Sequence, residues 1–233
     1  MTSTNTDLKE LAKHAWIFNS IAPIYNLFFQ AQVKNYRSLL ATYQKELQLV
    51  PGAAWEVLDI GCGTGAYLTA FAELGYQGTG VDFSAPMLKA ARRSTRNLTR
   101  KSTGNSIRHS TGKLTEHSGE LNLKFIQADA TKGLPFSDKS FDLVVAAYVL
   151  HGLRQSLRQQ IYAEAKRLAR RTVLFFDYNH KRSLPTDVIE WAEGGDYFNF
   201  IKLAEAEMQQ HFPLVKRLDV GPHSSIYICS PSN

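Results

Sequence analysis

The residues with the clearest chemical signature lie between Glu56 and Gly65, in the run Glu-Val-Leu-Asp-Ile-Gly-Cys-Gly-Thr-Gly. An apolar stretch that passes into alternating glycines is typical of a buried strand that feeds a tight turn. Glycine has no Cβ, so a ligand can approach the backbone, and a helix beginning near Gly65 is expected to direct unbonded N–H groups to the same place. Asp59 adds a carboxylate two positions before the first glycine, which favours a ligand that carries a positive charge.

Four predicted strands carry an aspartate at or near their C-terminal end. These aspartates are Asp59, Asp82, Asp129 and Asp177, on the segments 56–60, 76–82, 123–130 and 172–178. A carboxylate at the end of the second strand can accept hydrogen bonds from both hydroxyls of a ribose, as in nucleotide-binding sheets. Because the carboxyl ends of parallel strands line one edge of an open sheet, we expect the four aspartates to face a shared ligand-binding crevice.

The run from Glu56 to Gly65 resembles the first motif of class I S-adenosylmethionine-dependent methyltransferases, and the run Asp82-Phe83-Ser84-Ala85-Pro86-Met87 resembles the second. The segment Phe18–Asn26 is similar to an N-terminal motif of the methyltransferases related to quinone biosynthesis, the type 11 group. The resemblance implies S-adenosylmethionine as cofactor. The cofactor-binding residues that we predict are Asp59, Gly61, Cys62, Gly63, Gly65, Asp82, Phe83, Met87, Asp129, Ala130 and Ala146.

Within this set, the resemblance assigns Asp129 to the adenine amino group and places Phe83 and Met87 beside the adenine. The alternative for Phe83 and Met87 is that both pack in the core at a strand-to-helix corner, since methionine fills gaps readily. Ser84 is expected to cap the following helix, with Pro86 in its first turn.

The candidate catalytic residues are His151, Tyr148 and Tyr25, with Asp177 and Tyr178 as competitors. Methyl transfer from a sulfonium is an in-line displacement, so the enzyme mainly aligns the reactants and excludes water. A hydroxyl acceptor needs a base, and His151, just after the strand at 141–147, is the first candidate. A structural hydrogen-bonding role is the alternative for this histidine, and a thiol, amine or carbanion acceptor needs no base from the protein.

The predicted architecture is an α/β fold: a Rossmann-like, doubly wound, mostly parallel seven-stranded sheet with an antiparallel C-terminal hairpin. The segments 214–220 and 224–229 alternate as strands do, and their short link requires antiparallel neighbours. We predict one methyltransferase domain over residues 1–233, with an N-terminal helical lid over residues 1–50. An aromatic group, Trp191, Tyr197, Phe198 and Phe200, is expected either to wall the substrate crevice or to pack a helix on the sheet.

Composition limits the classes of function. The formal charge of +6 is concentrated in residues 92–120, where seven Lys or Arg face two Glu. The segment 94–120 is rich in Ser, Thr, Gly and Asn, so we predict a mobile basic insertion there. The two cysteines, Cys62 and Cys229, follow no metal-ligand or disulfide pattern, and no leader or bilayer-spanning run is apparent, so we expect a cytoplasmic protein without a metal.

Three functions remain open on the sequence. A small-molecule methyl acceptor is the favoured partner, with no membrane contact and an undetermined oligomeric state. An RNA or protein methyltransferase is an alternative supported only by the basic insertion, and it is not favoured because that segment lacks aromatic residues for base stacking. A nicotinamide-dependent oxidoreductase fits the glycines Gly61 and Gly63 with Ala66, but Asp59 argues against an anionic pyrophosphate.

Overall fold

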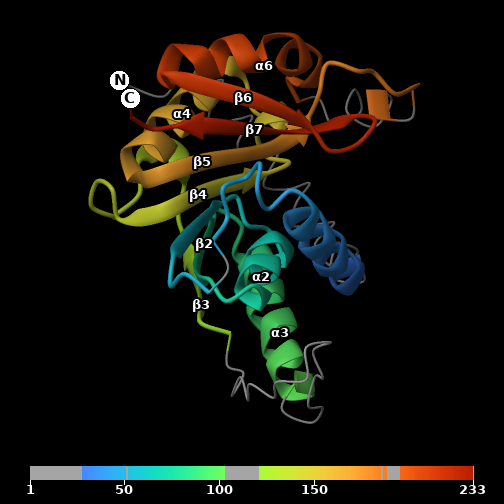
Figure 1. Cartoon of the computed structure of the whole chain (residues 1–233), viewed down its shortest axis with the longest axis vertical. Coiled ribbons are helices and arrows are strands. Elements are labelled where there is room, and N and C mark those ends of the chain that lie inside the picture. The colour runs from blue at the N-terminus through green and yellow to red at the C-terminus, as the bar shows by residue number, and fades with distance from the viewer. Residues whose placement is uncertain (1–27, 51, 103–120, 185, 188–194, 233) are drawn as a thin grey trace.

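The computed structural model describes residues 28–50, 52–102, 121–184, 186–187 and 195–232. A seven-stranded sheet with the order β3-β2-β1-β4-β5-β7-β6 crosses the centre of the molecule (Figure 1). The strands are β1 (Glu56–Ile60), β2 (Gln77–Asp82), β3 (Leu123–Gln127), β4 (Phe141–Ala147), β5 (Ala169–Tyr178), β6 (Leu214–Asp219) and β7 (Ser224–Ser230). The first five strands are parallel, and β7 runs antiparallel to both β5 and β6.

This topology confirms the predicted fold class, including the C-terminal hairpin. The strand order reverses between β1 and β4: β2 and β3 extend the sheet on one side, and β4 and β5 extend it on the other. In open α/β sheets, ligands bind outside the carboxyl ends of the strands at such a reversal.

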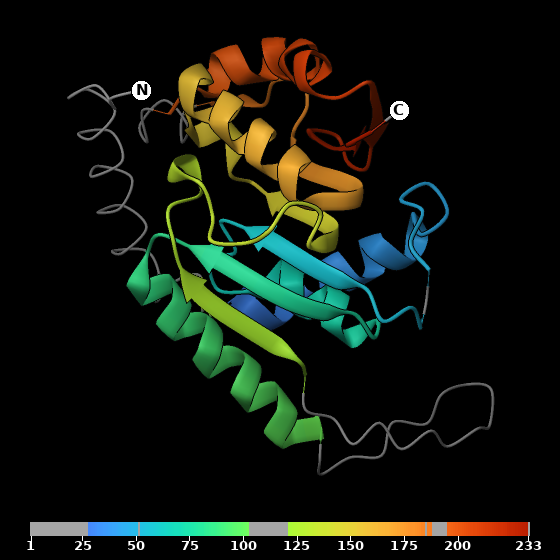
Figure 2. The same ribbon diagram turned by 90° about the vertical axis from the view of Figure 1, so that its left-hand side faces the viewer.

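Helices cover both faces of the sheet. Figure 2 shows α4 (Gln155–Leu168) and α6 (Tyr197–His211) on one side, with α2 (Ala66–Glu73), α3 (Ala85–Ser102) and the helical residues 28–42 on the other. Alternation along β1 decides which side each residue faces. Leu58 and Ile60 belong to the core cluster that includes α4 and α6, whereas Val57 packs with α2, so Asp59 shares the α2 side.

A buried arginine joins α4 to α6. Arg158 is fully buried, and its Nε and Nη2 donate to the two carboxylate oxygens of Glu207, each at 2.7 Å. Its Nη1 donates to Asp196 at 2.8 Å. Burial alone works to lower the pKa of Arg158, but the hydrogen bonds to Glu207 and Asp196 outweigh it and raise the pKa, so the guanidinium stays charged.

The structure corrects the predicted start of the basic insertion. Residues 94–102 are the last part of α3, and the buried Thr95 hydroxyl donates to the Ala91 carbonyl at 2.9 Å. Residues 103–120 of the predicted insertion and residues 1–27 of the predicted lid lie outside the described residues. Cys62 and Cys229 are both free thiols. Among the described residues, no helix has the length and apolar character that crossing a bilayer requires.

Candidate active site

The glycine turn after β1 is built mainly from left-handed backbone. Gly61, Gly63 and Gly65 have φ angles of 70°, 51° and 77°, which residues with a Cβ rarely adopt. The N–H groups of Gly61 and Cys62 both donate to the Val81 carbonyl, at 2.8 and 3.0 Å, and that of Gly65 donates to the Cys62 carbonyl at 2.8 Å. These three N–H groups are therefore already bonded within the protein, whereas the expected unbonded N–H groups are those of the first turn of α2, which begins at Ala66.

The three glycines differ in what surrounds them. A Cβ on Gly61 would lie 2.6 Å from a Val149 methyl carbon, and one on Gly65 would lie 2.9 Å from the Phe125 ring. Around Gly63, by contrast, no described atom lies within 4 Å of an added Cβ. Gly61 and Gly65 therefore serve internal packing, and Gly63 is the position at which a ligand can reach the backbone.

We expect Gly63→Ala to weaken the binding of S-adenosylhomocysteine by about tenfold or more, or about 1.4 kcal/mol, because the methyl group occupies the open side of the turn. The matched control is Gly75→Ala, since Gly75 also has a positive φ of 94° and open space around it but follows α2 at the other end of β2. An alanine is more strained at Gly75, whose φ of 94° lies outside the left-handed region, than at Gly63, whose φ of 51° lies within it, so strain alone predicts no greater loss at Gly63. Calorimetry that shows equal affinity losses in the two variants contradicts a ligand contact at Gly63.

Asp59 is a buried carboxylate without hydrogen-bond partners among the described residues. It is 1 % exposed, and neither oxygen is bonded. Burial raises the pKa of Asp59 well above its usual value, and the nearby Asp82 raises it further. The Leu68 N–H lowers this pKa in part, although it does not have the geometry of a hydrogen bond to Asp59. The hydroxyl of Tyr67, whose pKa is raised by its own burial and then by Asp59, is also buried and unbonded among these residues. An unpaired acid in such a place is suited to a cationic ligand.

Asp82 ends β2 beside the glycine turn. Its Oδ2 accepts from the Gly63 N–H at 2.9 Å, and its Oδ1 accepts from the Ser84 N–H at 2.8 Å. Burial raises the pKa of Asp82, although these two hydrogen bonds lower it in part. Each oxygen keeps a second lone pair, so the held carboxylate can accept from two adjacent hydroxyls. Ser84 caps α3 as predicted, since its hydroxyl accepts from the Met87 N–H at 3.3 Å.

Asp129 lies just beyond β3, at the start of the short 3-10 helix Ala130–Lys132. Its Oδ1 accepts from the Thr131 N–H and hydroxyl, at 3.0 and 2.6 Å, and its Oδ2 pairs with Lys132 at 2.9 Å. Burial pushes the pKa of Asp129 upward, but the Thr131 and Lys132 hydrogen bonds outweigh it and lower the pKa. Asp129 is thus a helix-capping carboxylate, and an adenine contact remains a proposal for it.

The other predicted cofactor residues fall into two groups. Phe83 and Ala130 are half-buried at the ends of β2 and β3. Met87, Cys62 and Ala146 are buried, at 3 %, 8 % and 2 % exposure. The Cys62 sulfur packs over Gly80, where an added Cβ would lie 2.7 Å from it. Ala146 belongs to the core cluster of Ile60 and Val144, the side of the sheet opposite Asp59, so the cofactor role predicted for Ala146 has no support from its position.

His151, which follows β4, and Asp177, near the C-terminal end of β5, form a buried pair. His151 Nδ1 lies 2.7 Å from Asp177 Oδ1, and the second carboxylate oxygen accepts from the Leu150 N–H at 2.9 Å. The Tyr178 N–H also donates to Oδ1, at 2.8 Å. A carboxylate that is held in this way fixes the orientation of the imidazole, as bases in enzyme sites require. Tyr25 lies outside the described residues.

Tyr148 follows β4 in a strained backbone conformation, with a φ of 54°. Its hydroxyl lies 2.8 Å from the Ser224 hydroxyl. Burial raises the pKa of Tyr148; Ser224 lowers it and Asp177 raises it. At neutral pH the phenol is therefore protonated, so Tyr148 is a poor candidate for the base and a better one for shaping the site.

Aromatic rings surround the histidine. The Tyr178 ring lies 4.8 Å from that of His151, 5.2 Å from that of Tyr148 and 5.1 Å from that of Tyr197. Phe198 continues the row, 5.1 Å from Tyr197. Of the predicted aromatic group, Tyr197 and Phe200 are buried in the core and Phe198 is half-buried, while Trp191 lies outside the described residues.

Sequence reasoning missed Tyr67 and Arg158. Tyr67 follows the glycine turn directly, and its hydroxyl is what distinguishes it from a plain core aromatic. Arg158 stands in a helix with mixed polarity, where an arginine normally faces water. No sequence signal linked it to Glu207, which lies 49 residues further along the chain.

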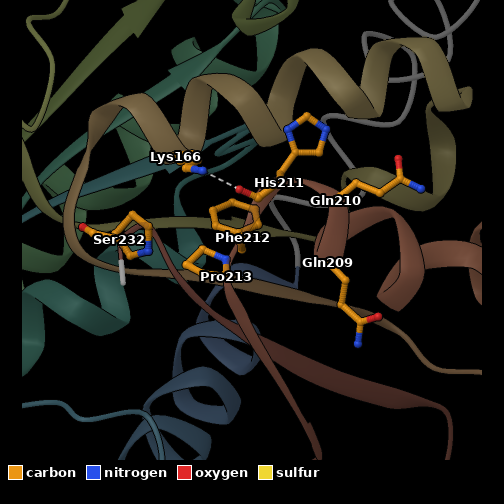
Figure 3. Close-up of a pocket in the computed structure, with 8 residues that line it drawn as sticks. Lys166, Gln209, Gln210, His211, Phe212, Pro213 and Ser232 are labelled. Atoms are coloured by element: carbon orange, nitrogen blue, oxygen red, sulfur yellow. Dashed lines mark hydrogen bonds between the residues drawn. The ribbon is translucent and has the colours of Figure 1, made fainter.

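The cavity in Figure 3, of about 450 Å³, lies at the amino end of β5, where Lys166 precedes that strand and Phe212 and Pro213 precede β6. Lys166 Nζ donates to the His211 carbonyl there at 2.6 Å. The four aspartates lie at the opposite ends of the parallel strands, so this open surface hollow is separate from them.

Comparison with known proteins agrees with this geometry. The sequence profile of the methyltransferase domain family matches residues 58–176, half of the chain. The demethylmenaquinone methyltransferase of Renibacterium salmoninarum is 28 % identical over 145 residues, which cover 60 % of this chain and 48 % of the relative. That of Clavibacter sepedonicus is 30 % identical over 105 residues, 45 % of this chain and 34 % of the relative. The matched regions thus span at most about half the length of these relatives.

Solved structures share the fold. A protein of Pyrococcus horikoshii has a TM-score of 0.59 at 21 % identity, covering 84 % of this chain and 91 % of that one. A SAM-dependent methyltransferase of Aquifex aeolicus has a TM-score of 0.53 at 16 % identity, and the match covers 81 % of this chain and 87 % of that one. Phosphoethanolamine N-methyltransferase 2 of Haemonchus contortus, in complex with S-adenosyl-L-methionine, has a TM-score of 0.59 at 17 % identity. The match covers 84 % of this chain and 52 % of that one.

The sheet order, the glycine turn and the profile match define a Rossmann-like methyltransferase fold. The chain belongs to the methyltransferase domain family. This membership decides against a nicotinamide-dependent oxidoreductase.

Proposed function

We propose that this protein transfers a methyl group from S-adenosylmethionine to a small organic acceptor. The observation that carries the proposal is the His151–Asp177 pair, which lies among aromatic rings at the C-terminal ends of β4 and β5. These strands follow β1 in the sheet, next to the proposed cofactor-binding edge of β1 and β2. Such a surface suits a compact acceptor with a ring and a proton to lose.

The residues at the glycine turn fit the cofactor. The cofactor supplies a methyl group on a positively charged sulfur. Asp59, an unbonded buried carboxylate, matches the charge of the methionine ammonium, and Asp82 matches the two ribose hydroxyls. The open side of Gly63 leaves room for the chain between these groups. Asp129, Phe83 and Met87 are proposed for the adenine end.

His151 is the proposed base for an acceptor that must lose a proton. Asp177 holds Nδ1, so the imidazole keeps one tautomer and an acceptor proton passes to Nε2. The rings of Tyr148 and Tyr178 orient the acceptor and exclude water, and this alignment is the main catalytic task in a displacement at carbon.

We expect His151→Gln to lower kcat by about 10²- to 10⁴-fold, the range for the loss of a general base, and to leave the affinity for S-adenosylhomocysteine unchanged. The control is His211→Gln, since His211 lies in the cavity at the other end of the sheet, and this variant is expected to keep full kcat. An unchanged kcat in His151→Gln assigns the histidine a structural role instead.

Demethylmenaquinone is the first acceptor to assay, because both curated relatives are named for it. The experiment incubates the protein with radiolabelled S-adenosylmethionine and demethylmenaquinone, or with a small-molecule extract, and follows label into low-molecular-weight products. Label that enters only RNA or protein fractions overturns the proposal of a small acceptor.

An RNA acceptor is the second candidate, and the outer side of α3 favours it. Lys89, Arg92, Arg93 and Arg96 are exposed at helical spacing, and the sequence of α3 contains no acidic residue. Such a stripe attracts phosphate groups without reading their sequence. Methylation of tRNA that disappears in Arg93→Glu supports this candidate over the small acceptor.

A further inference from the structure

The turn that carries His151 is held from two sides. This turn is the 3-10 helix Leu150–Gly152, which ends at Leu153. On one side, Asp177 Oδ2 accepts from the N–H groups of Leu150 and His151, at 2.9 and 3.4 Å. On the other side, Arg158 Nη1 donates to the Leu153 carbonyl. The ends of the turn are thus tied to β5 and to α4.

The same Arg158 nitrogen also holds the beginning of α6. Nη1 donates to Asp196 Oδ2 at 2.8 Å, while Nε and Nη2 are taken up by Glu207. Glu207 alone balances the charge of the guanidinium. Asp196 is therefore not required for neutralisation, and its contact has another consequence: it fixes where α6 starts relative to the His151 turn.

The residue before Asp196 packs directly on that turn. A Cβ on Gly195 would lie 3.0 Å from the Gly152 Cα, 3.3 Å from the Gly152 carbonyl oxygen and 3.4 Å from that of His151. No side chain fits there without moving the turn. On the other side of Asp196, Tyr197 is 1 % exposed and its ring lies 5.1 Å from Tyr178, which in turn contacts His151.

We infer that Arg158 and Asp196 are positioning residues, which set the His151 turn and the Tyr197 ring at a fixed distance through the contact of Gly195 with Gly152. They touch neither cofactor nor acceptor. The inference rests on the proposed function, in which His151 is the base, and it deepens that role. A displacement of about 1 Å at a reacting group can cost about 10²-fold in rate, so such support has a measurable effect.

The test uses two variants of the full chain. Asp196→Ala removes the contact with Arg158 and leaves the Arg158–Glu207 pair. It also removes the 2.6 Å hydrogen bond from the Asn199 amide to Asp196 Oδ1, but no side-chain bond from Asp196 to the α6 backbone. Gly195→Ala keeps Asp196 and pushes on Gly152 directly. The matched control is Asp138→Ala, which removes an exposed aspartate from another arginine, Arg167, at 2.7 Å.

The first readout is the ¹H–¹³C resonance of the His151 imidazole, assigned by its loss in His151→Gln. Both variants are expected to shift or broaden this resonance, and the control is expected to leave it in place, while the affinity for S-adenosylhomocysteine stays within about twofold in all three. An unchanged His151 resonance in both variants overturns the inference, whatever the acceptor is.

The second readout is the rate of methyl transfer to demethylmenaquinone. We expect each variant to lower kcat about tenfold or more, and the double variant His151→Gln/Asp196→Ala to be no slower than His151→Gln alone, because Asp196 acts through His151. Losses that multiply in the double variant overturn the inference. Full activity of the single variant His151→Gln, by contrast, overturns the proposal that His151 is the base. That result requires neither Asp196→Ala nor Gly195→Ala, so it is distinguishable from a failure of the inference.

Discussion

Replacing Asp59 with asparagine is expected to stabilise the protein and to weaken its cofactor binding. Asp59 is buried, unbonded among the described residues, and close enough to Asp82 to interact with it. Burial and then Asp82 raise its pKa, so the folded protein holds a proton that the unfolded chain releases. The wild type therefore loses stability as the pH rises from about 4 toward the folded pKa, by up to about 1.4 kcal/mol per pH unit.

The asparagine side chain of the Asp59→Asn variant cannot titrate, so the variant escapes this loss. We expect its advantage in the free energy of unfolding to be near zero at about pH 4 and to exceed about 1 kcal/mol at about pH 8. Urea unfolding at both pH values measures it, with Asp138→Asn as the control at an exposed site. The affinity for S-adenosylhomocysteine is expected to fall by roughly 1.5–3 kcal/mol, because a charged hydrogen-bond partner is lost.

Asp59→Asn is thus expected to raise the stability of the protein and to lower its affinity for S-adenosylhomocysteine. This combination distinguishes a ligand-binding aspartate from a structural one. A structural aspartate would give a less stable variant with normal binding. A variant that binds S-adenosylhomocysteine as tightly as the wild type contradicts an ammonium contact at Asp59.

Arg158→Met is expected to destabilise the protein by about 3–5 kcal/mol, since it leaves the carboxylate of Glu207 buried without its counter-charge. Glu207 is 2 % exposed, so water cannot replace the guanidinium. The double variant Arg158→Met/Glu207→Leu is expected to recover most of this loss, because two apolar side chains replace the buried pair and the Asp196 carboxylate that remains is partly exposed to water. Urea unfolding of the single and double variants measures both values.

A loss below about 1 kcal/mol in Arg158→Met would show that α4 and α6 do not depend on the pair. A double variant as unstable as the single one would show that the cost comes from packing rather than from the unpaired charge.

The strands and the aspartates near their C-terminal ends could be predicted from the sequence because their signals are local. β4 runs from Phe141 to Ala147 as predicted, and β6 and β7 pair antiparallel, because apolar alternation and short links determine these features directly. The aspartates follow from the same reasoning, since each one lies at or near the C-terminal end of its strand.

The remaining features depend on contacts between distant residues. α3 continues through Ser102: Ser94 and Thr95 are buried, and Arg92 ties the helix to the Phe125 carbonyl at 2.7 Å. The side that Ala146 faces follows from alternation along β4, since Val145 and Ala146 belong to the core clusters on opposite sides of the sheet. The Arg158 cluster was not predictable, since a charged side chain enters the core only when its partners are in place.

The binding of S-adenosylhomocysteine to Asp82→Ala, measured by calorimetry beside the wild type, tests the assignment of the cofactor to the edge formed by β1 and β2. The Asp82 carboxylate is held at the glycine turn by the Gly63 and Ser84 N–H groups, where it can accept from two ribose hydroxyls. We predict an affinity loss of roughly 1.5–3 kcal/mol in a variant that remains folded. Equal affinity in the folded variant and the wild type would contradict this assignment.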